Sequence, residues 1–92
     1  MRIVLILMLN RHLIEAFGKK IRQLRTEKGL SQEKLAELTG FHRTYIGMVE
    51  RGERNITLAN IGVFADSFEI TVSELLNLER TSFIHDEKTE ND

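Results

Sequence analysis

The chain has 92 residues and a mass of 10.7 kDa, enough for one small domain with a single core. Apolar residues make up 41% and charged residues 29%, which is the balance of a globular protein and not of a disordered one. The absence of cysteine excludes disulfide bonds, thiolate metal sites and cysteine catalysis. It also suits the reducing cytoplasm, where we expect the protein to act.

The net charge of −1 hides an uneven distribution along the chain. Residues 1–54 hold eleven Lys and Arg against six Asp and Glu, whereas residues 55–92 hold two against eight. Such asymmetry indicates that one half of the chain faces a polyanion and that the other half is turned away from it. The alternative is a surface charge that is unevenly spread by chance.

The first nine residues are nearly all apolar, with a single arginine before the run from Ile3 to Leu9. No small-residue cleavage site follows this run, and it is too short to span a bilayer. Its aliphatic and β-branched content suits a short strand or an adhesive arm. We expect residues 1–12 to form an apolar N-terminal arm that pairs with a second subunit. Packing on the domain, or a leader upstream of a later start at Met8, are the alternatives.

From residue 13 onward the sequence predicts five short helices and no sheet of consequence. The first helix ends at Gly29, and its apolar residues recur at helical spacing: Leu13, Ile14, Phe17, Ile21 and Leu24. Ser31 is the predicted N-cap of a second helix over 32–39, which Gly40 closes and whose inward residues are Leu35, Ala36 and Leu38.

A third helix is predicted over 43–51 and is stopped by Gly52. Thr57 caps a fourth helix, with Leu58, Ile61, Phe64, Ala65 and Phe68 as its apolar residues. Thr71 caps a fifth over 72–78, with Leu75 and Leu76 inward. These helices predict a DNA-binding and dimerisation domain over residues 13–78. Residues 79–92 are polar and acidic, and we expect them to form a flexible tail.

The segment from Ser31 to Gly52, SQEKLAELTGFHRTYIGMVERG, has the pattern of a helix-turn-helix unit. Ala36 is small where the second helix of the unit must cross the first, and Gly40 allows the positive φ that a sharp turn needs. At about 100° per residue, Ile46 and Val49 lie on the inward side of the second helix of the unit. The outward side carries no acidic residue: it holds Arg43, Thr44, Gly47, Met48 and Arg51. A glycine is a poor choice for an ordinary solvated helix face, so we interpret Gly47 as a place where a partner approaches closely.

Residues 13–78 resemble the phage Cro/repressor-type helix-turn-helix family, which implies an all-α, five-helix, lambda-repressor-like DNA-binding domain. Within that family, the run HRTYIGMVERGERNIT is similar to the controller proteins of restriction–modification systems, with an R-T-Y-I core followed by E-R-x-x-R-N. His42 departs from the acidic residue that is common at its position in those proteins. The resemblance implies DNA contacts from Gln32, His42, Arg43, Thr44, Tyr45, Gly47, Met48, Arg51, Arg54 and Asn55.

The roles that the resemblance implies agree with the chemistry of these side chains. Arg43 and Thr44 are expected at base edges, because arginine pairs bidentately with guanine and threonine contacts thymine or a polar edge. Gln32, at a helix N-terminus, is expected on a phosphate. Tyr45 is expected on the DNA backbone or a neighbouring base, and Met48 on a thymine methyl or in solvent. Arg54 and Asn55 are expected just beyond the recognition helix. Arg25 and Glu50 resemble the internal salt bridge of the family.

The sequence offers no constellation for catalysis. Its histidines, His12, His42 and His85, are far apart and lack the spacing of a metal-binding helix, and no phosphate-binding glycine loop is present. Glu33 and Glu37 lie one turn apart, which is typical of solvent-facing charge. We expect no enzymatic activity, cofactor, metal or small-molecule ligand.

Members of this motif class bind as dimers, so that two recognition helices enter major grooves about 34 Å apart. The last two helices hold more apolar groups than a small core buries, and we expect a two-fold interface from Ile61, Phe64, Phe68, Ile70, Leu75 and Leu76. The alternative is that all of them fill the core. The predicted function is a homodimeric transcription regulator on a pseudo-palindromic operator in double-stranded DNA. The alternatives are a phage-type repressor, or an antitoxin that binds a toxin and represses their shared promoter.

Overall fold

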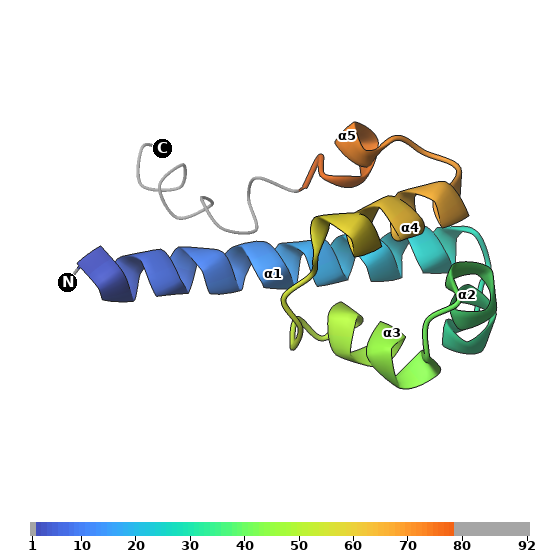
Figure 1. Cartoon of the computed structure of the whole chain (residues 1–92), viewed down its shortest axis with the longest axis horizontal. Coiled ribbons are helices and arrows are strands. Elements are labelled where there is room, and N and C mark those ends of the chain that lie inside the picture. Colours follow the sequence, from blue (N-terminus) through green and yellow to red (C-terminus); the bar gives the residue numbers. More distant parts are fainter. Residues whose placement is uncertain (1, 79–92) are drawn as a thin grey trace.

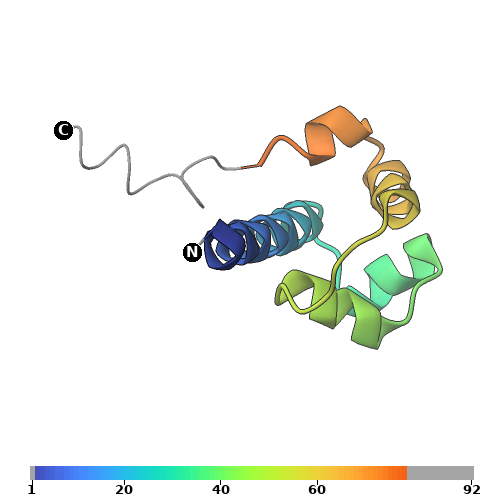
Figure 2. The same ribbon diagram turned by 60° about the vertical axis from the view of Figure 1, so that its left-hand side comes forward.

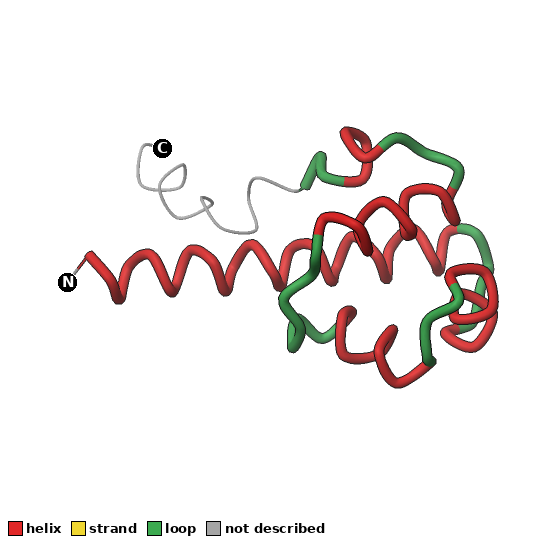
Figure 3. The backbone as a smooth tube through the Cα atoms, viewed as in Figure 1, coloured by secondary structure: helices red, strands yellow, loops and turns green. Residues whose placement is uncertain are grey.

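The computed structural model describes residues 2–78; the predicted tail, residues 79–92, lies outside the described residues. Five helices follow one another: α1 (Arg2–Glu27), α2 (Gln32–Thr39), α3 (Arg43–Glu50), α4 (Leu58–Phe68) and α5 (Val72–Leu75). No strand occurs in this part of the chain (Figure 3), so the predicted all-α, five-helix fold is confirmed. None of these helices is both long enough and apolar enough to cross a membrane.

The first helix is longer than the sequence predicts. α1 is continuous over 26 residues, and its N-terminal half extends beyond the other helices (Figures 1 and 2). The expected boundary between residues 12 and 13 therefore has no counterpart in the backbone, and of the two forms that the first residues suited, the short strand is not present. β-Branched Ile3 and Val4 continue a helix here because the helix-forming residues after them propagate it, and propagation costs less than starting a helix anew.

Predicted side-chain caps begin α2, α4 and α5, and a predicted glycine ends α2. The hydroxyl of Ser31 accepts a hydrogen bond from the Lys34 amide, and those of Thr57 and Thr71 cap α4 and α5 in the same way. Gly40 ends α2 with φ of 81°, a conformation that side chains with a Cβ rarely adopt. α5 ends at Leu75, three residues earlier than predicted.

The core lies where all five helices meet. Its largest fully buried side chains are those of Ile21, Leu35, Ile46, Val49, Phe64, Phe68 and Leu75. Phe64 is its centre, because the rings of Phe17 and Phe41 pack on it with centroids 6.3 and 5.3 Å away. The core therefore holds the two helices of the helix-turn-helix unit against α1 and α4.

The burial corrects several sequence-based expectations. Phe64, Phe68 and Leu75 have at most 1% of their surface exposed within one chain, so the prediction that they form a dimer interface is wrong. The other three residues of that set, Ile61, Ile70 and Leu76, keep part of their surface exposed. Leu38, expected inward, is about half exposed.

α1 and α3 approach each other most closely at Gly18. A Cβ at this position would lie 2.9 Å from the carbonyl oxygen of Glu50 and closer still to that of Val49. Gly62 in α4 is a contrasting case, since a Cβ there meets nothing within 4 Å. Gly18 is thus required by packing and Gly62 is not.

We predict that Gly18→Ala lowers the free energy of unfolding by about 1–3 kcal/mol, because the backbone carbonyls at the end of α3 cannot yield to the added methyl group. Gly62→Ala is the matched control and should gain about 0.4–1 kcal/mol from its lower unfolded-state entropy. Urea unfolding followed by circular dichroism measures both. Equal effects of the two substitutions would show that the close approach of α1 and α3 is not limiting.

Candidate nucleic-acid interface

α3 divides cleanly into an inner and an outer side. Ile46 and Val49 face the core, while Arg43 and Thr44 in the first turn are exposed and Met48 is half-buried. His42 precedes the helix as its N-cap residue without a side-chain hydrogen bond to the helix. The predicted outer surface is therefore present, and it lies on the side of the molecule opposite α5 (Figure 1).

Gly47 is not exposed on the outer side of α3, where the sequence predicted it. It is buried, because the side chains of Arg51 and Gln32 cover it: a Cβ at Gly47 would lie 3.1 Å from Nη1 of Arg51 and 3.9 Å from Nε2 of Gln32. The expectation that Gly47 is the open centre of the outer surface is wrong. Its missing side chain makes room for a guanidinium group that belongs to the protein itself.

A buried ion pair fixes the orientation of α3. Nε of Arg25 on α1 donates to Oε2 of Glu50 at 2.6 Å, and Nη2 donates to Oε1 at 3.1 Å. The Glu50 side chain is only 4% exposed. Nη1 of Arg25 also donates to the carbonyl oxygen of Leu30 at 2.8 Å, which ties in the connection to α2. The predicted Arg25–Glu50 salt bridge is confirmed, with the bidentate geometry that gives such pairs their specificity.

Gln32 joins the same network. Its Nε2 donates to Oε1 of Glu50 at 3.0 Å, so one carboxylate links α1, the first turn of α2 and the last turn of α3. The expected contact of Gln32 with a phosphate stays a prediction. The structure adds that the side chain of Gln32 is already positioned before any ligand arrives.

Two arginines of the outer surface are paired with acidic residues. Nε of Arg43 lies 3.0 Å from Oε2 of Glu33 on α2, and Arg51 forms two hydrogen bonds, of 2.9 and 3.2 Å, to the Glu53 carboxylate. The hydrogen bond raises the pKa of Arg51 and lowers the pKa of Glu53. All four side chains are about half exposed or more. Pairs this exposed are worth less than about 1 kcal/mol, so either arginine can exchange its partner for another anion.

Tyr45 is anchored in the protein by its ring and its hydroxyl. The ring packs edge-on against Phe41 with centroids 5.0 Å apart, and the hydroxyl accepts a hydrogen bond of 3.0 Å from Nδ2 of Asn60. The guanidinium carbon of Arg54 lies 5.4 Å from the Tyr45 ring centre, in the range of a cation–π contact. Tyr45 therefore holds Arg54 beside the recognition helix.

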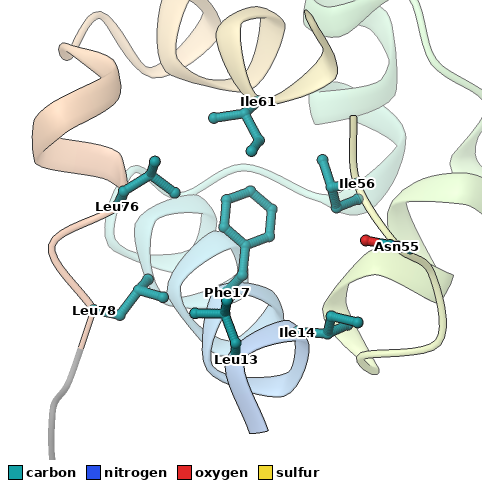
Figure 4. A pocket seen from close by; sticks show the side chains of 8 residues that line it. All are labelled: Leu13, Ile14, Phe17, Asn55, Ile56, Ile61, Leu76 and Leu78. Atoms are coloured by element: carbon teal, nitrogen blue, oxygen red, sulfur yellow. The ribbon is translucent and has the colours of Figure 1, made fainter. Parts of the chain in front are cut away.

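Asn55 lies beside Arg54 and also borders α1. It follows Arg54 in the connection between α3 and α4, and its side chain borders an apolar pocket beside α1 (Figure 4). Glu33, Glu53 and Asn60 contribute to the site but were missed from the sequence. The acidic residues carried no signal, because contacts between helices that pair them with arginine depend on the fold.

Among residues 2–78, no group of three or more His, Cys, Asp and Glu is placed to hold a metal ion. The outer surface of α3 instead carries guanidinium groups, a hydroxyl and a thioether on a helix narrow enough to enter a major groove.

We predict that Glu50→Gln lowers the free energy of unfolding by about 3–5 kcal/mol, because it leaves the charge of Arg25 buried without compensation. Glu53→Gln is the control, since that carboxylate is half exposed and should cost less than about 1 kcal/mol. Denaturant titration of both variants provides the measurement. A small loss for Glu50→Gln would mean that the ion pair contributes no more than a surface pair.

The chain is similar to known helix-turn-helix proteins. The helix-turn-helix family model matches residues 21–75. The control protein C.SmaI of Serratia marcescens is 47% identical over 62 residues, which cover 67% of this chain and 74% of the relative.

Two solved structures of controller proteins share the fold. The restriction–modification controller protein C.AhdI of Aeromonas hydrophila is 52% identical, with a TM-score of 0.64 and coverage of 68% of this chain and 94% of that chain. The controller protein C.Esp1396I, solved as a tetramer in complex with its natural 35 base-pair operator, is 33% identical, with a TM-score of 0.64 and coverage of 70% and 88%.

Proposed function

Since the chain belongs to the helix-turn-helix family, we propose that it is a sequence-specific transcriptional regulator that binds a pseudo-palindromic operator as a homodimer. Similarity to C.SmaI and C.AhdI supports a role as a controller of restriction–modification genes. This family consists of DNA-binding regulators and not of enzymes. The protein acts in the cytoplasm, where such operators are found.

The observation that carries the proposal is the exposed first turn of α3 on a helix that the interior holds rigidly. Arg43 and Thr44 point outward, while the buried Glu50 carboxylate fixes the other end of the same helix. Base readout needs donors and acceptors placed in advance within a fraction of an ångström. An exposed first turn on a helix whose other end is fixed supports this requirement.

The acidic partners of the arginines fit this function. Glu33 holds Arg43 extended along the surface between α2 and α3, and Glu53 holds Arg51 over Gly47. A guanine edge offers Arg43 two acceptors, and a phosphate offers Arg51 a full negative charge. Each arginine therefore exchanges one anionic or polar partner for another when DNA binds.

The charge of the described residues supports the direction of binding. Residues 32–54, on α2, α3 and the connection that follows, hold four Lys and Arg and four Glu, whereas residues 55–78 hold Asp66, Glu69 and Glu74 and no Lys or Arg. α5, with Glu74, is on the far side of the domain from α3 (Figure 2). The far side of the domain therefore repels DNA more strongly than the surface that carries α3.

We predict that Arg43→Ala costs about 1–3 kcal/mol on the specific operator and abolishes the preference at one base pair of each half-site. Duplexes selected from a random pool by the wild-type protein should give a two-fold symmetric site, and those selected by the variant should lose one position in each half. Lys34→Ala is the control, because Lys34 lies on α2 beside Glu37 and outside the α3 surface. The proposal fails if the wild-type protein selects no sequence over random DNA.

We predict that Arg54→Ala weakens binding to specific and random DNA alike and lowers the salt slope of binding by about one unit. The reason is that Arg54 packs on the Tyr45 ring outside the first turn of α3, which supports a phosphate contact and not a base contact. Fluorescence anisotropy over a range of salt concentrations measures the slope. An unchanged slope would remove Arg54 from the phosphate contacts.

A further inference from the structure

Asn60 on α4 fixes the hydroxyl group of Tyr45 on α3. Its Nδ2 lies 3.0 Å from the phenolic oxygen, although the two residues are 15 positions apart in the sequence. Asn60 is itself held in the first turn of α4, because its backbone amide donates to the hydroxyl of the N-cap residue Thr57 at 3.1 Å. Both Asn60 and Tyr45 are partly exposed, so their hydrogen bond lies at the surface and not in the core.

The direction of this hydrogen bond decides which partner the hydroxyl can still take. An amide NH2 group only donates, whereas a phenolic hydroxyl has one proton to donate and two lone pairs that accept. The amide of Asn60 therefore occupies a lone pair of Tyr45 and leaves the hydroxyl proton free. In the part of the chain that the structure describes, that proton is donated to no acceptor.

Asn60 stands where a carboxylate would stabilise the helix more. It is the third residue of α4, in a first turn that holds no acidic residue, and the helix dipole favours carboxylates near a helix N-terminus. A carboxylate at this position would accept the proton of Tyr45, however, and would repel a phosphate. The neutral amide holds the hydroxyl group and keeps its proton available.

We propose that Asn60 is a positioning residue, which directs the hydroxyl proton of Tyr45 to a phosphate oxygen of the DNA backbone. Phosphate oxygens accept hydrogen bonds and do not donate them, so they match a hydroxyl whose proton is free. Base edges in the major groove present donors as well as acceptors. The inference rests on the proposed function, because it specifies how one residue of that surface meets DNA.

The place of Arg54 supports a phosphate beside Tyr45. The guanidinium carbon of Arg54 lies 5.4 Å from the centre of the Tyr45 ring. Arg43 and Arg51 each have a carboxylate partner, whereas Arg54 forms no salt bridge with any of residues 2–78. A guanidinium group without a carboxylate partner and a hydroxyl with a free proton together offer two donor groups to one anion.

Without Asn60, packing alone would hold the Tyr45 ring. Phe41 contacts this ring edge-on at 5.0 Å, and Phe41 itself packs on Phe64 in the core at 5.3 Å. These contacts keep the ring in place but do not set the rotation of the hydroxyl proton, because apolar contacts are not directional. The hydrogen bond from Asn60 supplies the direction and so lowers the entropic cost of the phosphate contact.

The test uses two substitutions of Asn60 and a charge control. Asn60→Leu removes the donor and keeps a side chain of similar volume, and Asn60→Asp replaces the donor with an acceptor for the Tyr45 proton. Ala59→Asp is the control, because it adds the same charge to the same turn of α4 at an exposed neighbour. Fluorescence anisotropy measures the binding of each protein to a duplex selected by the wild-type protein and to a random duplex.

We expect Asn60→Leu to weaken binding about 5–10-fold and Asn60→Asp about 10-fold or more. Both losses should be the same on selected and random DNA, since a phosphate contact carries no sequence information. Ala59→Asp should cost about twofold or less, because its charge is exposed and screened. Equal losses for Asn60→Asp and Ala59→Asp, or a loss confined to the selected duplex, would overturn the proposal.

The salt dependence distinguishes Asn60 from Arg54. Asn60→Leu should leave the salt slope of binding unchanged, because neither Asn60 nor Tyr45 carries a charge that displaces counterions from DNA. Arg54→Ala is the positive control, since it removes such a charge. A slope that falls as much in Asn60→Leu as in Arg54→Ala would mean that Asn60 acts through Arg54, which contradicts the proposal.

A double-mutant cycle shows whether Asn60 acts through the Tyr45 hydroxyl. The hydroxyl is absent in Tyr45→Phe, so the further substitution Asn60→Leu should cost nothing more in that background. Phosphate ethylation of the selected duplex should weaken the wild-type protein at one phosphate of each half-site to which Tyr45→Phe and Asn60→Leu are both insensitive. An undiminished effect of Asn60→Leu in the Tyr45→Phe background would refute the proposed route.

The single tyrosine of the chain gives this contact a spectroscopic signal of its own. Tyrosine labelled with carbon-13 at Cζ yields one resonance, whose chemical shift responds to the hydrogen bonds of the hydroxyl. Asn60→Leu should move this resonance in the free protein and Ala59→Asp should not, while circular dichroism confirms that both variants are folded. An unmoved resonance in Asn60→Leu would show that the amide does not hold the hydroxyl, and the proposal would fall.

The same binding curves separate this inference from the proposed function. If the wild-type protein prefers one sequence and Asn60→Leu binds as tightly as the wild-type protein does, the inference fails and the proposed function stands. If the wild-type protein binds DNA without preferring any sequence, the proposed function fails, and binding to random DNA still decides the inference. If the wild-type protein binds no DNA, both fail.

Discussion

The buried carboxylate of Glu50 is the constraint on which the rest of the structure depends. It is the single point at which α1, the start of α2 and the end of α3 meet through hydrogen bonds, from Arg25 and Gln32. Apolar contacts alone allow a helix to rotate or slide by small amounts at little cost, because they are not directional. A bidentate guanidinium–carboxylate pair allows neither, since its geometry is planar and fixed. The interior therefore sets the angle of the helix whose other side meets a ligand.

The outer surface of α3 is held by weak, exposed ion pairs and not by a rigid buried one. Its ion pairs, Arg43 with Glu33 and Arg51 with Glu53, are exposed and weak. They orient the two arginine side chains but do not prevent them from pairing with another anion. A rigid backbone and exchangeable ion-pair partners together keep the two arginine side chains ordered and exposed before the proposed binding to DNA. This arrangement lowers the entropic cost of ordering long side chains at the moment of binding.

Local signals in the sequence predicted most of the fold. Ser31, Gly40 and Thr57 mark helix ends through their own hydrogen bonds or backbone conformations, so both ends of α2 and the start of α4 needed no tertiary information. The inner and outer sides of α3 followed from helical spacing in the same way. Contacts between distant segments could not be predicted from local sequence. The pairing of Arg43 with Glu33 and the cover over Gly47 depend on how the helices cross. Phe64 and Phe68 looked surplus to a small core, but the core proved able to bury them. β-Branched residues near the N-terminus suggested a strand, although the helix that follows extends through them.

The division of α3 into two sides has a consequence for how such proteins diversify. Residues 43 and 44 lie in an exposed turn, whereas the residues that hold the helix in place, Ile46, Val49 and Glu50, point into the domain. Substitutions in the exposed turn leave the free energy of folding nearly unchanged, as surface substitutions generally do. Two descendants of one ancestral gene can therefore acquire separate operators by a few such changes, without passing through an unstable intermediate. A cell that carries several regulators of this type can keep them from acting on one another's promoters.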